Sequence, residues 1–159
     1  MADSRERSNF YTLKGYDLIG PHEVSPAMED YLEMICRCGG NPGYVRINAL
    51  AARLNVKPSS ASKMVAKLRE QGFVSFEPYG IVTPTEKGWG LGSYLLHRHE
   101  VLQRFFCLVN RSENELRLVE QIEHFIGPDT IGNMEALIPE LEQLRKVSQS
   151  ETHKNVTSS

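Results

Sequence analysis

The sequence predicts a mostly α-helical protein in which a winged helix-turn-helix unit is followed by an all-helical domain. Residues 25–83 contain three segments with the periodicity of amphipathic helices and then a short strand–turn–strand segment, the order typical of a winged helix-turn-helix. Beyond them the periodicity is helical throughout. We therefore expect a flexible arm at 1–24, the winged unit at 25–90, a helical domain at 91–147 and a disordered tail at 148–159.

The first helix is predicted to follow the arm, which shows no sustained period. Ser25 is placed to cap the helix, Pro26 to occupy its first position, and Glu29 to reach back as in a capping box. Its apolar stripe consists of Tyr31, Met34, Ile35 and Cys38. The glycines from Gly39 onward end it.

The second and third helices have their apolar residues on one face each. The second is short and carries Ile47, Leu50, Ala51 and Leu54. The third begins near Lys57-Pro58 and ends at Gly72, with Ala61, Met64, Val65 and Leu68 at the spacing of a buried face.

A two-stranded wing is predicted next, and three helices after it. The alternating segments Phe73–Glu77 and Ile81–Thr83 flank a turn at Pro78-Tyr79-Gly80. A hydroxyl at Thr83, a proline and Glu86 then begin a helix that ends near Asn110. Two further helices are expected over 112–126 and 130–147. In the first of the three, Gly88, Gly90 and Gly92 each cost about 1 kcal/mol relative to alanine, so they indicate close helix approach or a hinge.

The composition excludes several classes of protein. No apolar run is long enough to cross a bilayer, and the N-terminal residues lack the apolar core of a secretion signal. Three cysteines give no paired disulfide framework and are typical of reduced thiols. We expect a cytoplasmic protein without a membrane partner.

The third helix is the candidate for binding DNA. The net charge of the whole chain is −2, but residues 53–72 hold five basic side chains and one acidic one. Small residues at the start of this helix allow close approach to base edges and phosphates. The predicted DNA-contacting residues are Lys57, Pro58, Ser59, Ser60, Ser62, Lys63, Lys67 and Tyr79. The alternative is a simple three-helix packing module with solvated lysines.

A candidate metal site is indicated by Glu120, Glu123 and His124. Residues spaced i, i+3 and i+4 share one face of a helix, and on a helical wheel these three flank an apolar face that includes Phe125. Carboxylate and imidazole donors suit a hard or borderline cation such as Mn²⁺. The alternative is an ordinary solvated, charged face.

Two more donor groups lie upstream. Asp30 and Glu33, at i and i+3, project together from the first predicted helix. His97 and His99 are two residues apart on the long helix, so only one of them can face the same site. Each group alone also fits a solvated helix face or an imidazole satisfied in the core.

These motifs together resemble the diphtheria-toxin-repressor family of metal-dependent transcription factors. The resemblance extends over residues 25–147. The segments that carry it are SPAMEDYLE at 25–33, PSSASKMVAKL at 58–68, YGIVTPTEKG at 79–88, HRHE at 97–100 and VEQIEH at 119–124.

The resemblance implies a homodimer that binds a palindromic operator in double-stranded DNA, with two Mn²⁺ ions per subunit between the winged unit and a helical dimerisation domain. Iron-responsive members have methionine and cysteine at the positions of Asp30 and Glu120, so carboxylates there favour manganese. The expected function is manganese-responsive repression of manganese uptake genes. Carried over by position, the metal ligands are Asp30, Glu33, His99, Glu120, Glu123 and His124.

Two other classes of function are compatible with parts of the sequence. The chain could be a winged-helix regulator that responds to iron or to another effector. Carboxylate and histidine clusters also activate water in metal-dependent hydrolases. However, no candidate nucleophile or general base remains once all six donors serve as ligands, so we do not expect an enzyme.

Overall fold

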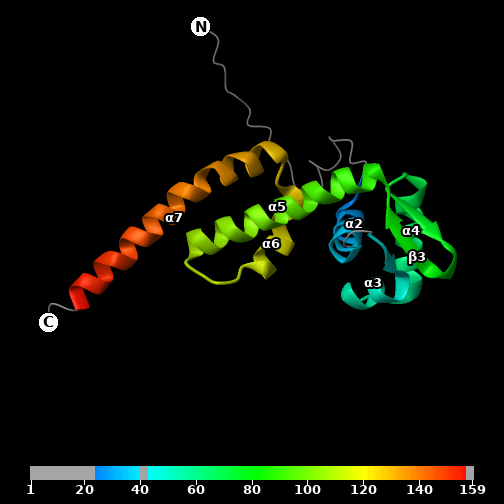
Figure 1. Ribbon diagram of the computed structural model, residues 1–159, viewed down its shortest axis with the longest axis horizontal. Coiled ribbons are helices and arrows are strands. Elements are labelled where there is room, and N and C mark those ends of the chain that lie inside the picture. Colours follow the sequence, from blue (N-terminus) through cyan, green and yellow to red (C-terminus); the bar gives the residue numbers. More distant parts are fainter. Residues whose placement is uncertain (1–23, 40–42, 157–159) are drawn as a thin grey trace, which may run out of the picture.

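The computed structural model describes residues 24–39 and 43–156, so almost all of the predicted arm lies outside the described residues. The winged unit lies at one end of the molecule, and α7 runs along α5 toward the other (Figure 1). The elements in chain order are α2 (Pro26–Gly39), β1 (Val45–Arg46), α3 (Ile47–Arg53), α4 (Pro58–Glu70), β2 (Val74–Glu77), the 3₁₀ turn η1 (Pro78–Gly80), β3 (Ile81–Pro84), α5 (Glu86–Asn110), α6 (Leu116–Ile122), the 3₁₀ turn η2 (Glu123–Phe125) and α7 (Pro128–Val156).

The helices α2, α3 and α4 form the predicted helix-turn-helix around one apolar core. Ser25 caps α2 as predicted, because its Oγ accepts a hydrogen bond from the Met28 N–H at 3.3 Å. Asn55, with φ of 53°, makes the tight link between α3 and α4. The apolar stripes meet in the interior, where the completely covered side chains include Leu32, Ile35, Leu50 and Leu68.

The wing has three strands, not two. β2 and β3 pair antiparallel as predicted, with Phe76 opposite Val82. β1 adds to the other edge of β3, with Val45 opposite Val82. The prediction missed β1 because two residues are too short to show an alternation. At the wing tip Tyr79 is 94% exposed and has a left-handed φ of 67°.

The long helix α5 links two apolar cores. Its cap is Thr85, whose Oγ1 accepts a hydrogen bond from the Gly88 N–H at 3.1 Å. The predicted cap at Thr83 is wrong, because β3 continues through Pro84. The first half of α5 packs on the winged unit, and its second half packs on a smaller core that includes Leu102, Val119 and Ile131.

The last two predicted helices have different bounds in the structure. The helix expected at 112–126 is the shorter α6 followed by η2. The helix expected at 130–147 begins at Pro128 and continues to Val156. Although α5 and α7 are long, no helix within the described part of the chain is apolar enough to cross a bilayer.

Two of the three glycines of α5 permit close packing. A Cβ added at Gly88 would lie 1.9 Å from the carbonyl oxygen of Phe73, and one at Gly92 would lie 2.3 Å from Cys36 Sγ. A Cβ at Gly90 would have nothing within 4 Å. Close approach of α5 to the winged unit therefore explains Gly88 and Gly92, and nothing in the structure explains Gly90.

We predict that Gly88→Ala lowers the thermal unfolding midpoint by several degrees. Relieving the contact with Phe73 requires a backbone shift, and such overpacking costs about 1–3 kcal/mol. Gly90→Ala is the matched control in the same helix and should stabilise the protein by about 0.5–1 kcal/mol. Thermal unfolding followed by circular dichroism measures both, and a Gly88→Ala protein as stable as the wild type would contradict the packing argument.

Candidate metal centre

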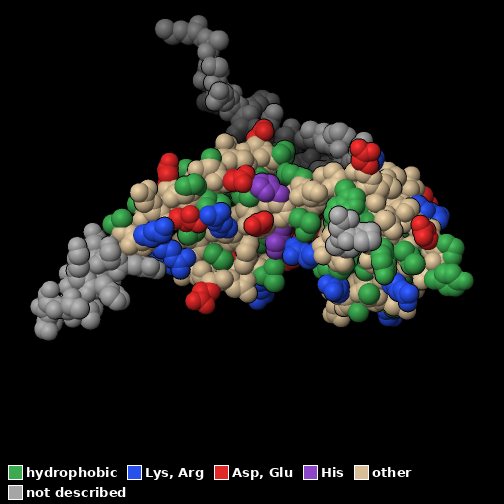
Figure 2. Space-filling view, in the orientation of Figure 1, with side chains coloured by type: hydrophobic (Ala, Val, Ile, Leu, Met, Phe, Trp, Pro, Cys, Tyr) green, Lys and Arg blue, Asp and Glu red, His purple; other side chains and the backbone are tan. Residues whose placement is uncertain are grey.

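The six predicted donors lie together where the winged unit meets the smaller core. They come from elements far apart in the sequence, and Figure 2 shows histidine side chains at the surface in the middle of the molecule, between its two parts. Helix α2 supplies Asp30 and Glu33, α5 supplies His99, α6 supplies Glu120, and η2 supplies Glu123 and His124.

The distances between these side chains are short. His99 Nδ1 lies 3.1 Å from Glu123 Oε2 and 3.9 Å from oxygens of both Glu33 and Glu120. His124 Nε2 lies 3.0 Å from Asp30 Oδ1.

Among the described residues, two groups of three donors have ligand atoms within 4.8 Å of one another. One group is Asp30, Glu123 and His124. The other is Glu33, His99 and Glu123. Glu123 belongs to both, and only 1% of it is exposed.

The helical wheel drawn from the sequence fails at the end of α6. Glu123 and His124 lie in a 3₁₀ turn, which has about 3.0 residues per turn rather than 3.6. This change of twist buries Glu123 and leaves Phe125, expected on the apolar face, 60% exposed. On α5, His99 is buried in the donor cluster, whereas His97 Nε2 lies 3.1 Å from Glu135 of α7.

The carboxylates of the cluster raise the pKa values of its two histidines. Hydrogen bonds to Asp30 and Glu29 raise the pKa of His124 to about 10. A hydrogen bond to Glu123 raises the pKa of His99. Burial and the neighbouring Glu123 carboxylate raise the pKa of Glu120. The donor set thus favours positive charge at this place, which a divalent cation supplies.

Two residues of this region were not predicted from the sequence. Arg98 is buried, and its Nη2 donates to Glu29 Oε2 at 2.8 Å. The same oxygen lies 2.7 Å from His124 Nδ1. Burial raises the pKa of Glu29, but the hydrogen bonds from His124 and Arg98 outweigh burial and lower it. The predicted capping-box role of Glu29 is therefore wrong. A signal for Arg98 was present, because it follows Leu95 and precedes Leu102 in the apolar stripe of α5.

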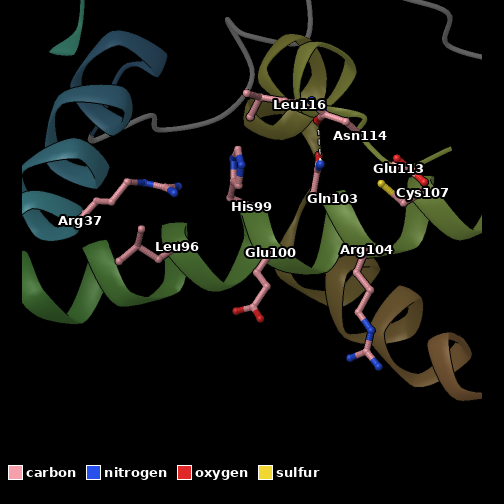
Figure 3. A pocket seen from close by; sticks show the side chains of 10 residues that line it. All are labelled: Arg37, Leu96, His99, Glu100, Gln103, Arg104, Cys107, Glu113, Asn114 and Leu116. Atoms are coloured by element: carbon pink, nitrogen blue, oxygen red, sulfur yellow. Dashed lines mark hydrogen bonds between the residues drawn. The ribbon is translucent and has the colours of Figure 1, made fainter.

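Four of the six donors, Asp30, Glu33, His99 and Glu120, line a cavity of about 450 Å³ together with Arg37. A second cavity of about 570 Å³ runs along α5. In it His99 and Gln103 point toward α6, while Glu100 and Arg104 point away (Figure 3). Because His99 is the only one of the six donors that lines the second cavity, the first cavity is the candidate cation site.

The predicted DNA-contacting residues lie on the surface. The face of α4 opposite Ala61, Val65 and Leu68 is exposed, and Lys and Arg side chains gather around α3 and α4 (Figure 2). No side chain caps the N-terminus of α4, so this helix end is open to an anion. The exposed residues of the predicted set are Lys57, Pro58, Ser59, Ser60, Ser62, Lys63, Lys67 and Tyr79.

Comparison with known proteins gives a consistent set of relatives. The family described as "Iron dependent repressor, N-terminal DNA binding domain" matches residues 23–82. The HTH-type transcriptional regulator MntR of Lysinibacillus sphaericus is 36% identical over an alignment of 137 residues that covers 83% of this chain and 99% of that protein. MntR of Geobacillus kaustophilus is 38% identical over 115 residues, which are 72% of this chain and 82% of that protein.

Solved structures share the fold. The manganese regulator SloR has a TM-score of 0.63 at 21% identity, over 73% of this chain and 55% of its own. A manganese-dependent transcriptional repressor in complex with manganese has a TM-score of 0.56 at 27% identity, over 70% of this chain and 52% of its own. The chain therefore spans about half the length of these two proteins.

We predict that the stability of the metal-free protein falls as the pH rises from about 6.5 to about 10. Unfolded histidine loses its proton near 6.5, whereas folded His124 keeps it to about 10, so the stabilisation is complete below 6.5 and lost through this range. Urea titrations at stepped pH in the presence of a chelator measure this dependence. His124→Asn should flatten it, and the same pH slope in both proteins would contradict the assignment.

Proposed function

This chain belongs to the diphtheria-toxin-repressor family of metal-dependent transcription regulators, and from this premise we propose that it is a manganese-responsive regulator that binds operator DNA as a homodimer. The observation that carries the proposal is the pair of donor groups, one with Asp30 and His124 and one with Glu33 and His99, that both include Glu123. The family consists of regulators, so the hydrolase alternative is set aside. A regulator of transcription acts where the chromosome lies, and we place it in the cytoplasm.

The donors fit manganese by their chemistry. They are carboxylate oxygens and imidazole nitrogens, without a thiolate or thioether, as hard or borderline cations prefer. Because Glu123 belongs to both donor groups, we propose two ions per subunit with Glu123 serving both. A bound cation would supply positive charge among carboxylates that otherwise rely on protons. The proposed ligands are Asp30, Glu33, His99, Glu120, Glu123 and His124.

The regulatory step that we propose is that metal binding restricts the orientation of α4 relative to the smaller core. Helix α2 packs against α4 on one side and against α5 on the other. Asp30 and Glu33 on α2, once held to Glu123 on η2, fix the angle between the winged unit and the smaller core. Two α4 helices in a dimer can enter half-sites one DNA turn apart only within a narrow range of such angles. Fixing the angle shifts the population toward the form that binds DNA.

Two surfaces are suited to the proposed partners, one on α4 and the wing for DNA and one on α7 for a second copy of the chain. The exposed residues of α4 would enter the major groove, and Tyr79 at the wing tip would meet the flanking backbone. A two-fold dimer binds a palindromic operator, and repression follows where the operator overlaps a promoter. On α7, Leu137 and Leu144 are 47% and 65% exposed and lie two turns apart on one side, an apolar surface that a partner subunit would cover.

The proposal is tested by measuring operator affinity with and without Mn²⁺. Duplexes selected from random DNA in the presence of Mn²⁺ supply the operator, and fluorescence anisotropy supplies the affinity. We expect Mn²⁺ to tighten binding about tenfold or more. Glu123→Gln should abolish this effect, while Glu135→Gln, a change on α7 outside the donor set, should keep it. Equal affinity with and without Mn²⁺ would refute the proposed function.

The choice of metal gives a separate prediction. Glu120→Cys introduces a thiolate, a softer donor, so the response to Fe²⁺ relative to Mn²⁺ should rise. Anaerobic DNA-binding assays with each metal measure this ratio. Glu113→Cys, an exposed position before α6, controls for the added thiol. An unchanged ratio in the Glu120→Cys protein would show that donor softness at this position does not set selectivity.

A further inference from the structure

The cluster contains a charged pair, the buried Arg98 and the partly buried Glu29, that the proposed ligand set does not use. Only 4% of the Arg98 side chain and 19% of the Glu29 side chain are exposed. Arg98 Nη2 donates to Glu29 Oε2 at 2.8 Å, and that oxygen lies 2.7 Å from His124 Nδ1. Three residues from α2, α5 and η2 therefore meet at one carboxylate oxygen.

The two ring nitrogens of His124 have different surroundings. Nε2 faces Asp30 Oδ1 at 3.0 Å, within the donor group that also contains Glu123. Nδ1 lies 2.7 Å from Glu29 Oε2 and 3.4 Å from Arg98 Nη2, so its shorter contact is with Glu29, which belongs to neither donor group of the described residues. An ionised carboxylate only accepts hydrogen bonds, so Nδ1 carries the proton between them. Such a contact fixes the tautomer and the ring orientation of a metal-binding histidine.

Arg98 keeps Glu29 in place and charged. A buried arginine without a partner is costly, so its pairing with Glu29 is strongly favoured in this fold. Its Nε is buried and has no hydrogen-bond partner among the described residues, and Nη2 makes its contacts with Glu29 and His124. A lysine that reaches the same point would therefore preserve the essential contact.

We propose that Glu29 is a positioning residue that directs His124 Nε2 at the cation, and that Arg98 holds Glu29 for this task. The inference rests on the proposed function, since it takes His124 as a ligand. The pair of Glu29 and Arg98 also links α2 to α5, because the two side chains join these helices directly beside the donors.

The test uses the full chain and four variants, Glu29→Gln, Glu29→Ala, Arg98→Met and Arg98→Lys. Calorimetric titration with Mn²⁺ gives affinity and stoichiometry. Nitrogen NMR of labelled histidine, with Zn²⁺ as a diamagnetic probe, gives the tautomer of His124. Glu135→Gln is the control, because it alters another histidine–glutamate contact between helices, at His97, outside the donor set. Circular dichroism of the chelated proteins monitors the fold.

We expect Glu29→Ala and Arg98→Met to weaken Mn²⁺ binding about 10- to 100-fold at unchanged stoichiometry. Glu29→Gln, which fills the same volume and keeps an acceptor, should lose less, and Arg98→Lys should restore most of the affinity. In the wild type the Nδ1–H tautomer should dominate, and in Glu29→Ala it should not.

Different outcomes separate the inference from the proposed function. Wild-type affinity and an unchanged tautomer in Glu29→Ala, while His124→Gln abolishes binding, would overturn the inference alone. Loss of one equivalent of Mn²⁺ in both Glu29 variants would make Glu29 a ligand and also overturn it. Normal Mn²⁺ binding by His124→Gln would refute the proposed ligand set, and the inference with it.

Discussion

The arrangement of the two parts of this protein depends on compensating the charge of one buried carboxylate. Glu123 is almost fully enclosed, and an enclosed carboxylate is tolerated only beside positive charge. His99 provides that charge when protonated, at 3.1 Å. Because His99 belongs to α5 and Glu33 of α2 is 3.9 Å from the same ring nitrogen, the need for compensation draws three elements together. The junction is therefore electrostatic at its centre and apolar on either side.

Helix α2 transmits this constraint to the DNA-binding surface. One face of α2 contributes Leu32 and Ile35 to the core that it shares with α4, and another face carries Asp30 and Glu33. A packed core transmits displacement because it has few voids to absorb it. Gly92 brings α5 against Cys36 of α2 without space for even a methyl group. A displacement of Asp30 and Glu33 therefore either moves α4 relative to the smaller core or is resisted by the packing of α2.

The sequence was informative where a regular period continued for several turns. The buried face of α4 followed from apolar spacing, and the six donors are near one another as the family resemblance implied. On α2, Tyr31 and Ile35 are buried as predicted, but the buried Leu32 was not predicted, and Met34 is only partly buried. The sequence was misleading where the period changed. The change from α6 to a 3₁₀ turn altered the directions of Glu123 and His124, and no local sequence pattern predicted this change. Glu29 fits a capping box by position, but its carboxylate finds stronger charged partners 69 and 95 residues away. Such long-range competition is invisible to local patterns.

Two of the arginines near the donors, Arg37 and Arg98, differ in how easily a cation could replace them. Arg98 is enclosed, so its charge is a permanent part of the fold. Arg37 donates to Glu33 at 2.5 Å, but its side chain is 45% exposed, and leaving the carboxylate returns its guanidinium to water at little cost. Glu33 can therefore exchange Arg37 for another cation, whereas Glu29 cannot exchange Arg98. Glu33 is therefore available as a metal ligand, whereas Glu29 stays bound to Arg98. Both glutamates lie on α2, four residues apart.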